Sequence, residues 1–226
     1  MIGLLVALVL SVAPLPPERP APNLPPIPAP RPEPAARSVP TIITEPQAIT
    51  PIGIVCQDPR LIGEGLADIV SQDRPCGVLS PVRVREVAGV ALSHPAVLNC
   101  PTARRFADWV GGIAQPAAKD AFGQPIRRLR VMGSYVCRTR NHRPGAKISE
   151  HGKGRAIDIG GMTLSGGREI TLLGDWGAGE AGAFLARLHA QSCGLFHTVL
   201  GPDADRLHRD HFHFDTAQRG GDAYCR

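Results

Sequence analysis

Residues 128–136 read RLRVMGSYV, a run that indicates the central strand of the fold. The clearest helix precedes this strand and covers Pro101–Ala118. Pro101 suits the first turn of a helix, and large apolar side chains such as Phe106 and Trp109 recur on one side of the segment. The pattern therefore predicts a helix that leads into a central strand.

The segments on either side complete the predicted fold. Apolar residues at roughly helical spacing predict a first helix at Asp58–Val70, and β-branched residues favour a strand pair over Cys76–Val90. The later elements that we expect are a helix at Glu180–Gln191 and short strands at Leu195–Leu200 and His211–Asp215. Helices that come early and strands that come late indicate an α+β domain over residues 41–226. We expect a small antiparallel sheet that carries the functional site, with flanking helices and disulfide bonds.

Residues 1–13, MIGLLVALVLSVA, form an apolar run that is too short to cross a bilayer comfortably, which takes about 20 residues. The run fits the apolar region of a secretory signal, and Ser11-Val12-Ala13 resembles a small-residue cleavage site. No Lys or Arg precedes it and Pro14 follows it, so an uncleaved signal anchor and a start codon placed too far downstream both stay open. We expect export to the periplasm or cell envelope, with anchorage in the membrane if the segment is kept.

Residues 14–40 are rich in proline, which occurs 23 times in the whole chain. Such a segment lacks backbone donors and large apolar groups, so it cannot build a core. A buried strand at residues 1–13 is disfavoured for the same reason, because no core can form beside this segment. We expect a disordered, extended spacer of the polyproline type between the signal and the folded domain.

The chain has six cysteines, an even number, and none of them has the Cys-x-x-Cys spacing of a thiolate zinc site. In an exported protein they indicate up to three disulfides, although six cysteines allow 15 pairings. We expect Cys56 to pair with Cys76 and Cys193 to pair with Cys225. The candidates are Cys56, Cys76, Cys100, Cys137, Cys193 and Cys225.

The net charge of +5 and the isoelectric point near 9.1 make the chain mildly basic. This balance favours anionic partners such as wall polymers. The basic residues are scattered, and two Trp and two Tyr are too few for a platform on which bases could stack. We therefore expect no nucleic-acid partner.

The strongest chemical signal is SEHGKGRAID at residues 149–158. On an unbroken strand, His151 and Asp158 would face opposite sides, because an odd offset reverses the face. A turn at Gly152–Gly154 removes this objection and can bring both side chains to one point. Imidazole nitrogen and carboxylate oxygen are both good zinc ligands.

A second cluster, HRDHFHFD, covers residues 208–215. On a strand, His211 and His213 project from one face, while Phe212 and Phe214 point into the core. Three of the eight histidines of the chain lie within this short cluster, which packing alone does not explain. A His-rich patch that sequesters metal is the main alternative to a catalytic site.

Two histidines and one carboxylate make a catalytic zinc set with an open fourth position, and we expect one zinc ion per chain. Bound zinc lowers the pKa of water towards about 7, and a further histidine can relay a proton to a leaving amine. The expected reaction is metal-assisted hydrolysis, most naturally of an amide.

The chain resembles two groups of known proteins. Ser149, His151, Gly154, Ala156 and Asp158 match the S-x-H-x-x-G-x-A-x-D signature of zinc peptidases that cut peptidoglycan peptides. These peptidases include the D-alanyl-D-alanine peptidases, the lysostaphin type and the penicillin-insensitive murein endopeptidase. From about residue 56 to the end, the chain also resembles the bacterial extensin-like protein C-terminal family. The segments that carry this second resemblance are Cys100-Pro101, GSYVCR at 133–138, SEHGKGRAIDI at 149–159, Asp175-Trp176-Gly177, Phe196–Pro202 and the H-x-x-H-x-H-x-D ending.

The resemblance implies roles for single residues. His151, Asp158 and His213 would be zinc ligands, and His211 would transfer protons with His208 beside it. Arg138 and Arg140 lie where relatives carry an arginine that binds substrate, although an exposed solvated cation is an equal alternative for each. Ser149 would support the site through a hydrogen bond or a turn.

One departure from the peptidases bears on the reaction. The D-alanyl-D-alanine peptidases place a catalytic Glu or Asp three residues before a Trp-His element, whereas this chain has His208 and no Trp there. The H-x-x-H-x-H arrangement is nearer the murein endopeptidase. The choice between His211 and His213 as the third ligand stays open at this point. The remaining histidines, which we expect to be structural or on the surface, are His94, His142, His189 and His197.

The leading functional hypothesis is a zinc-dependent hydrolase of peptidoglycan peptide bonds, either an endopeptidase or a carboxypeptidase. Two alternatives remain: an envelope protein that binds wall peptides without cutting them, and a periplasmic protein that binds or sequesters zinc. The presence of His151, Asp158 and His213 disfavours the first alternative, because a catalytic site that decays usually loses its metal ligands first. The second predicts tight metal binding without hydrolysis.

Overall fold

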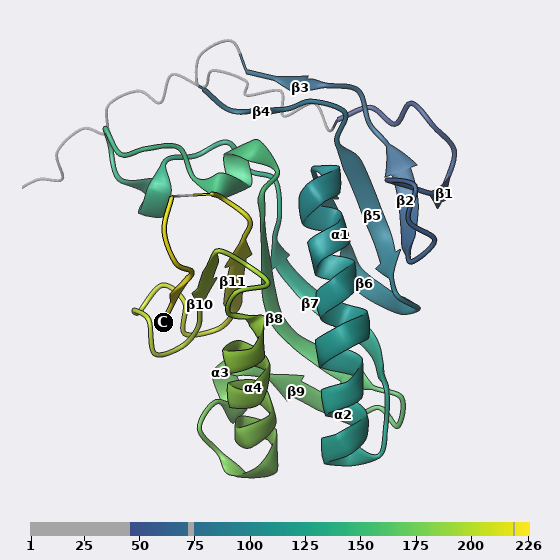
Figure 1. The fold of residues 1–226 in the computed structure, drawn as a ribbon, viewed down its shortest axis with the longest axis vertical. Coiled ribbons are helices and arrows are strands. Elements are labelled where there is room, and N and C mark those ends of the chain that lie inside the picture. The colour runs from purple at the N-terminus through teal and green to yellow at the C-terminus, as the bar shows by residue number, and fades with distance from the viewer. Residues whose placement is uncertain (1–45, 72–74, 219) are drawn as a thin grey trace, which may run out of the picture. The chain divides into compact units, whose positions relative to one another are not determined.

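The computed structural model describes residues 46–71, 75–218 and 220–226 (Figure 1). The predicted signal segment at residues 1–13 and the predicted spacer at 14–40 lie outside the described residues. Among the described residues, no helix is both long enough and apolar enough to span a membrane.

Within the part of the chain that the structure describes, ten strands form one mixed sheet. Their order across the sheet is β1-β2-β5-β6-β7-β8-β11-β10-β12, and β9 pairs with β8. The strands of this sheet are β1 (Gly53–Ile54), β2 (Leu61–Gly65), β5 (Val82–Val87), β6 (Val90–Leu98), β7 (Ile126–Gly133), β8 (Ala156–Leu164), β9 (Glu169–Thr171), β10 (Thr198–Leu200), β11 (Phe212–Asp215) and β12 (Tyr224–Cys225). A separate two-stranded sheet contains β3 (Ile69–Val70) and β4 (Gly77–Val78).

The helices come from three parts of the chain. A continuous helical segment joins β6 to β7, a shorter pair follows β9, and two single turns lie between β7 and β8. In order they are α1 (Cys100–Trp109), the π-helical turn η1 (Val110–Ala114), α2 (Gln115–Phe122), the 3₁₀ turns η2 (Arg140–His142) and η3 (Glu150–Lys153), α3 (Leu172–Asp175) and α4 (Gly179–Ser192).

The α+β class and the disulfides are confirmed, but the prediction of a small antiparallel sheet was wrong. The sheet is large, and the pairs β6–β7 and β10–β12 are parallel. Parallel neighbours need a crossover connection, which the continuous helix from α1 to α2 supplies between β6 and β7. The predicted helix at Pro101–Ala118 is therefore real, and it supplies the crossover of the parallel pair β6–β7.

The helix predicted at Asp58–Val70 was wrong, because this segment contains β2 and β3. Glu64 of β2 is buried and forms ion pairs with Arg83 and Arg85 of the neighbouring strand β5. These contacts across the sheet stabilise an extended backbone and outweigh the helical preference that the spacing of the apolar residues indicates.

Most of the other predicted elements are present with adjusted bounds. The central strand is β7, the later helix is α4, and the last two predicted strands are β10 and β11. Two strands do lie within Cys76–Val90, but β4 pairs with β3 and β5 pairs with β2 and β6, so they are not partners of each other. The sequence reasoning did not predict the long strands β6 and β8.

The core lies between the sheet and the helices, which stand in front of the strands in Figure 1. Trp109 of α1 packs against Phe214 of β11 with ring centroids 5.1 Å apart, and Phe196 stacks on Phe214 at 4.7 Å. All three rings are fully buried. This contact anchors β11, the strand that carries the second histidine cluster, to the helical layer.

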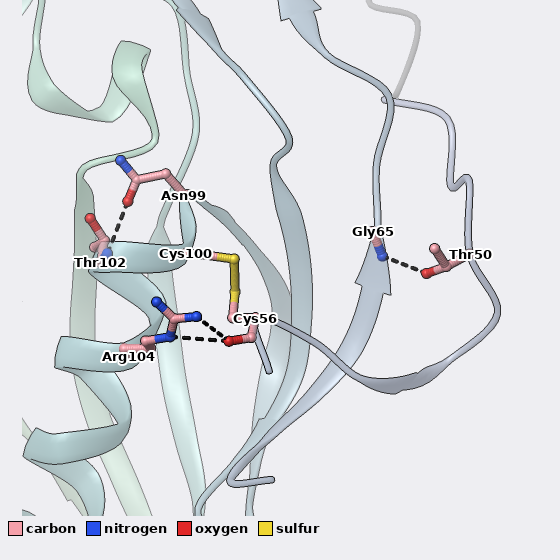
Figure 2. Close-up of a disulfide and its surroundings, with 7 residues drawn as sticks. All are labelled: Thr50, Cys56, Gly65, Asn99, Cys100, Thr102 and Arg104. Atoms are coloured by element: carbon pink, nitrogen blue, oxygen red, sulfur yellow. Dashed lines mark hydrogen bonds between the residues drawn. A yellow bond between two sulfur atoms is a disulfide. The ribbon is translucent and has the colours of Figure 1, made fainter. Parts of the chain in front are cut away.

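Three disulfides join Cys56 to Cys100, Cys76 to Cys137 and Cys193 to Cys225. The expected Cys193–Cys225 bond is confirmed, and the expected Cys56–Cys76 bond was wrong. Cys56 instead bonds to the first residue of α1, where Asn99 caps the helix by accepting a hydrogen bond from the main-chain N–H of Thr102 (Figure 2). Arg104 of the same helix donates to the main-chain oxygen of Cys56.

Candidate metal centre

The pairing of β8 with β11 places Asp158 directly opposite His213. Their neighbours Ile157, Ile159 and Phe212 are fully buried in the core against the helices. Since successive side chains of a strand alternate between faces, Asp158 and His213 project from the face without helices. Their side chains meet there, with His213 Nδ1 2.9 Å from Asp158 Oδ1.

The turn that precedes β8 brings His151 to the same point. The predicted turn at Gly152–Gly154 takes the form of η3, which ends at Gly154 with a positive φ of 63°. His151 Nε2 then lies 3.1 Å from Asp158 Oδ2 and 3.1 Å from His213 Nδ1. The side chain of His151 is only 1% exposed.

A main-chain or carboxylate oxygen contacts the outer nitrogen of each ring. His151 Nδ1 lies 2.6 Å from the main-chain oxygen of Ser134, and His213 Nε2 lies 3.5 Å from Asp215 Oδ2. A protonated outer nitrogen that donates to such an acceptor leaves the lone pair of the inner nitrogen directed at the centre. Histidine ligands of metals are commonly held in this way.

The donor atoms fit a small metal ion. One donor atom from each of His151, Asp158 and His213 lies within 4.8 Å of the others. In a tetrahedral zinc site with bonds of about 2.0–2.2 Å, ligand atoms lie roughly 3.3 Å apart. The separations here are 2.9 to 3.1 Å, with one oxygen of Asp158 facing each histidine. Two imidazoles and one carboxylate, with room for a fourth ligand, form a donor set that zinc accepts.

The charges of the three groups depend on one another. Burial disfavours the charged form of Asp158, but hydrogen bonds from His151 and His213 hold the pKa of this carboxyl well below its usual range. Burial also favours the neutral ring of His213, yet its hydrogen bonds to Asp158 and Asp215 raise the pKa of His213 to about 9. Without a metal, a proton on His213 therefore takes the place of a cation at this centre.

Two imidazole–carboxylate pairs flank the centre. His208 Nδ1 lies 2.9 Å from Asp205 Oδ1, and His211 Nδ1 lies 2.7 Å from Asp210 Oδ1. Burial lowers the pKa of His208, although Asp205 opposes this effect. His211 Nε2 is 3.8 Å from Asp158 Oδ1, so the structure brings His213 rather than His211 into the set of donor atoms.

A cavity of about 450 Å³ opens beside the three donor residues. Arg138, Arg140, Ser149 and His208 line it, whereas His211 does not. Arg140 Nη2 is 3.2 Å from Oε1 of the buried Glu150, which holds this guanidinium at the cavity wall. Of the residues that the sequence singled out, all but His211 therefore meet at the donor atoms or on the wall of this cavity.

Sequence reasoning missed several residues of the site. Ser134 contributes only a main-chain oxygen, so its side chain gave no signal. Asp205 stands three residues before His208, a spacing that could have suggested the pair. His197, expected to be structural or on the surface, lines the cavity. The further lining residues that the sequence analysis did not assign include Glu150, Asp215 and Tyr224.

Comparison with known protein families gives a match over most of the domain. The family described as Extensin-like protein C-terminus matches residues 61–226, which is most of the chain. No curated protein and no solved structure matches. The matched range contains all the residues of the candidate metal centre.

Proposed function

The chain belongs to the extensin-like protein C-terminus family, and from this premise we propose that it is a zinc-dependent hydrolase of peptidoglycan peptide bonds. The observation that carries the proposal is the meeting of His151, Asp158 and His213, with donor atoms 2.9 to 3.1 Å apart. The donor set, its burial and the oriented outer nitrogens support a single zinc ion per chain held by these three residues. Zinc supplies Lewis acidity toward a carbonyl group and a hydroxide nucleophile near neutral pH.

The surroundings of the centre support hydrolysis rather than storage of the metal. His208 lines the cavity, and burial lowers its pKa and favours its neutral ring, so it is suited to accept a proton there. Asp205 holds the opposite nitrogen of this ring and can stabilise the charged form once a proton is taken up. A site that only sequesters zinc has no need of such a pair beside an open cavity.

The cavity walls support a peptide as the ligand. Arg138 and Arg140 offer planar guanidinium groups that can bind a carboxylate of a peptide or stabilise a developing oxyanion. The volume of about 450 Å³ lies in the range of sites for small ligands, so it can take a short peptide segment but not a folded protein. The substrate that we propose is therefore a peptide of the bacterial wall, cut by an endopeptidase or a carboxypeptidase.

The proposed location is the periplasm or cell envelope. Three disulfides use all six cysteines, a state that persists in oxidising compartments outside the cytosol. The apolar run at residues 1–13 and the proline-rich residues 14–40 suit export followed by a spacer that lets the catalytic domain reach the wall.

The test measures zinc content and muropeptide hydrolysis on the same preparations of the full chain. The wild type is compared with a His151→Ala/Asp158→Ala double variant. We expect about one zinc per chain and release of cleaved muropeptides, with both lost in the double variant. The products then identify the scissile bond.

Two outcomes would contradict the proposal in different ways. Zinc in the wild type without cleavage of any muropeptide would favour a protein that binds wall peptides or sequesters zinc. No metal in the wild type, at any pH at which the chain stays folded, would refute the centre itself.

A further inference from the structure

A second hollow lies on the face of the sheet that carries no helices. Its volume is about 380 Å³, and β6, β7, β8 and β9 form its walls. It shares no lining residue with the cavity beside the metal centre. The polar residues that line it include Ser93, His94, Arg128, Arg130, Thr163 and Glu169.

The alternation along β7 produces the cationic wall of this hollow. Leu129 is fully buried in the core, so its neighbours Arg128 and Arg130 project from the opposite face, and both are exposed. Among the residues that the structure describes, neither arginine forms an ion pair. Two guanidinium groups on one short stretch of strand are thus available to a ligand.

The strand register places the two arginines on the same face as the metal centre. On β7 and β8, Arg128 pairs with Thr163, Arg130 with Gly161, and Gly133 with Asp158. The ladder has register shifts between Arg130 and Gly133, which let Gly161 and Thr163 share a face with Asp158 despite their odd offsets along β8. From Asp158 to Gly161 and Thr163, β8 rises at most about 10 and 17 Å.

Met132 of β7 lies between the two sites. A Cβ atom at Gly160 would lie 2.6 Å from Cγ and 2.9 Å from Sδ of Met132, and 3.3 Å from the main-chain oxygen of Asp210, so both cover this buried glycine. The main chain of Ile170 and Thr171 lies against Gly161, which follows it. The surface between the metal centre and the arginines therefore presents the exposed side chain of Met132, along which an extended polymer can lie.

We propose that Arg128 and Arg130 form a subsite for the carboxylates of an extended anionic polymer, bound while another part of the same polymer occupies the metal centre. The identity of the polymer, a peptidoglycan strand with its acidic stem peptides, rests on the proposed function. Guanidinium groups suit carboxylates, because they can donate two parallel hydrogen bonds to one group. Thr163 adds a hydroxyl between the strands.

One acidic residue limits the affinity of this subsite. Glu169 of β9 pairs with Thr163, so Arg128, Thr163 and Glu169 lie in one row across three strands. The arginines and Glu169 give the hollow two positive charges and one negative charge. Removal of the carboxylate of Glu169 should therefore strengthen the binding of an anionic polymer, whereas removal of the arginines should weaken it.

The experiment measures binding of soluble, uncross-linked peptidoglycan strands to the full chain by fluorescence anisotropy. It compares wild type, Arg128→Gln/Arg130→Gln and Glu169→Gln. The control, Arg105→Gln/Arg143→Gln, removes two other exposed arginines that make no ion pair among the described residues. All proteins are stripped of metal, so that binding is read without cleavage, and the assay is repeated at raised salt.

We expect Arg128→Gln/Arg130→Gln to raise the Kd about tenfold, since two exposed ion pairs contribute modestly, and this difference should shrink at high salt. Glu169→Gln should lower the Kd, and the control should not change it. Equal binding by wild type and Arg128→Gln/Arg130→Gln would overturn the subsite. So would arginine-dependent binding of inorganic polyphosphate with no binding of peptidoglycan strands. The wild type could fail to cleave muropeptides while Arg128→Gln/Arg130→Gln still binds the strands more weakly than the wild type. That result would support the subsite and refute only the proposed hydrolase activity.

Discussion

Asp158 and His213 are direct partners in the antiparallel register of β8 and β11, and Nδ1 of His213 lies 2.9 Å from Oδ1 of Asp158. The two residues are far apart in the chain, so the ladder of main-chain hydrogen bonds holds them together. His151 joins them from the turn before β8. The centre is therefore built mainly on rigid strands, which favours a fixed geometry for a bound metal.

Asp158→Asn should abolish tight zinc binding. The substitution keeps the shape of the side chain but removes the charge of one of three ligands. Since loss of even an outer-shell partner commonly costs 10- to 100-fold in metal affinity, we expect a fall of more than about a hundredfold in isothermal titration calorimetry. Asp210→Asn, which alters the carboxylate beside His211, is the matched control and should bind zinc normally. An equal loss in both variants would contradict the ligand assignment.

The stability of the metal-free protein should fall as the pH rises from about 6.5 to about 9. The pKa of His213 is raised from 6.5 to about 9 in the folded state, so its proton stabilises the fold fully below pH 6.5. This contribution is lost as the pH passes the pKa of the folded state. Thermal unfolding at a series of pH values, with metal removed, should show a lower midpoint across this window. His213→Gln should remove this part of the pH dependence, and an unchanged profile in that variant would contradict the assignment.

Gly133→Ala should disturb the metal centre directly. A Cβ atom at this position would lie 2.7 Å from Oδ2 of Asp158, closer than side-chain carbons approach other atoms. Overpacking of this kind costs about 1–3 kcal/mol, and a displaced carboxylate should weaken zinc binding. Gly112→Ala serves as the control, because nothing lies within 4 Å of the added atom and the residue is helical. Chemical denaturation should give a lower free energy of unfolding for Gly133→Ala than for Gly112→Ala. Equal stability of the two variants would show that the carboxylate of Asp158 can move aside.

Asp205→Asn should slow hydrolysis without affecting zinc affinity. The carboxylate of Asp205 holds Nδ1 of His208, and a neutral amide cannot stabilise the charged ring to the same extent. We expect kcat for muropeptide cleavage to fall about tenfold or more, with little change in KM. Asp210→Asn tests the other imidazole–carboxylate pair, which lies away from the cavity. A larger fall in kcat for Asp210→Asn than for Asp205→Asn would show that His211, rather than His208, transfers the proton.

Loss of the Cys193–Cys225 disulfide should destabilise the domain and leave the metal centre intact. The bond closes a loop with a sequence separation of 32, for which the chain-entropy model gives about 3–4 kcal/mol. Urea denaturation of Cys193→Ser/Cys225→Ser should show this loss, while zinc affinity is retained because β12 contributes no ligand. Unchanged stability would mean that the parallel pairing of β10 with β12 holds this part of the chain without the bond.

The elements that could be predicted from the sequence are those whose secondary structure follows from the local spacing of apolar residues. The helix at Pro101–Ala118 followed from its first turn and its apolar face, and α1, η1 and α2 occupy this segment. The segment from Asp58 to Val70 shows the opposite case. Its apolar spacing suited a helix, but pairing with β5 and the ion pairs of Glu64 made it extended. Local spacing cannot report contacts between strands that lie apart in the sequence.

The sequence by itself determined which side chains can reach one another within a short segment. The alternation in residues 211–215 puts histidines on one face and phenylalanines on the other, and the turn near Gly154 lets His151 and Asp158 meet. Only the tertiary structure decided that His213 rather than His211 joins them, that Cys56 bonds to Cys100, and that Arg128 and Arg130 share a face with the centre. These facts depend on strand register and on the packing of distant segments, because hydrogen bonds and core contacts across the sheet select one alignment among several that the local pattern allows.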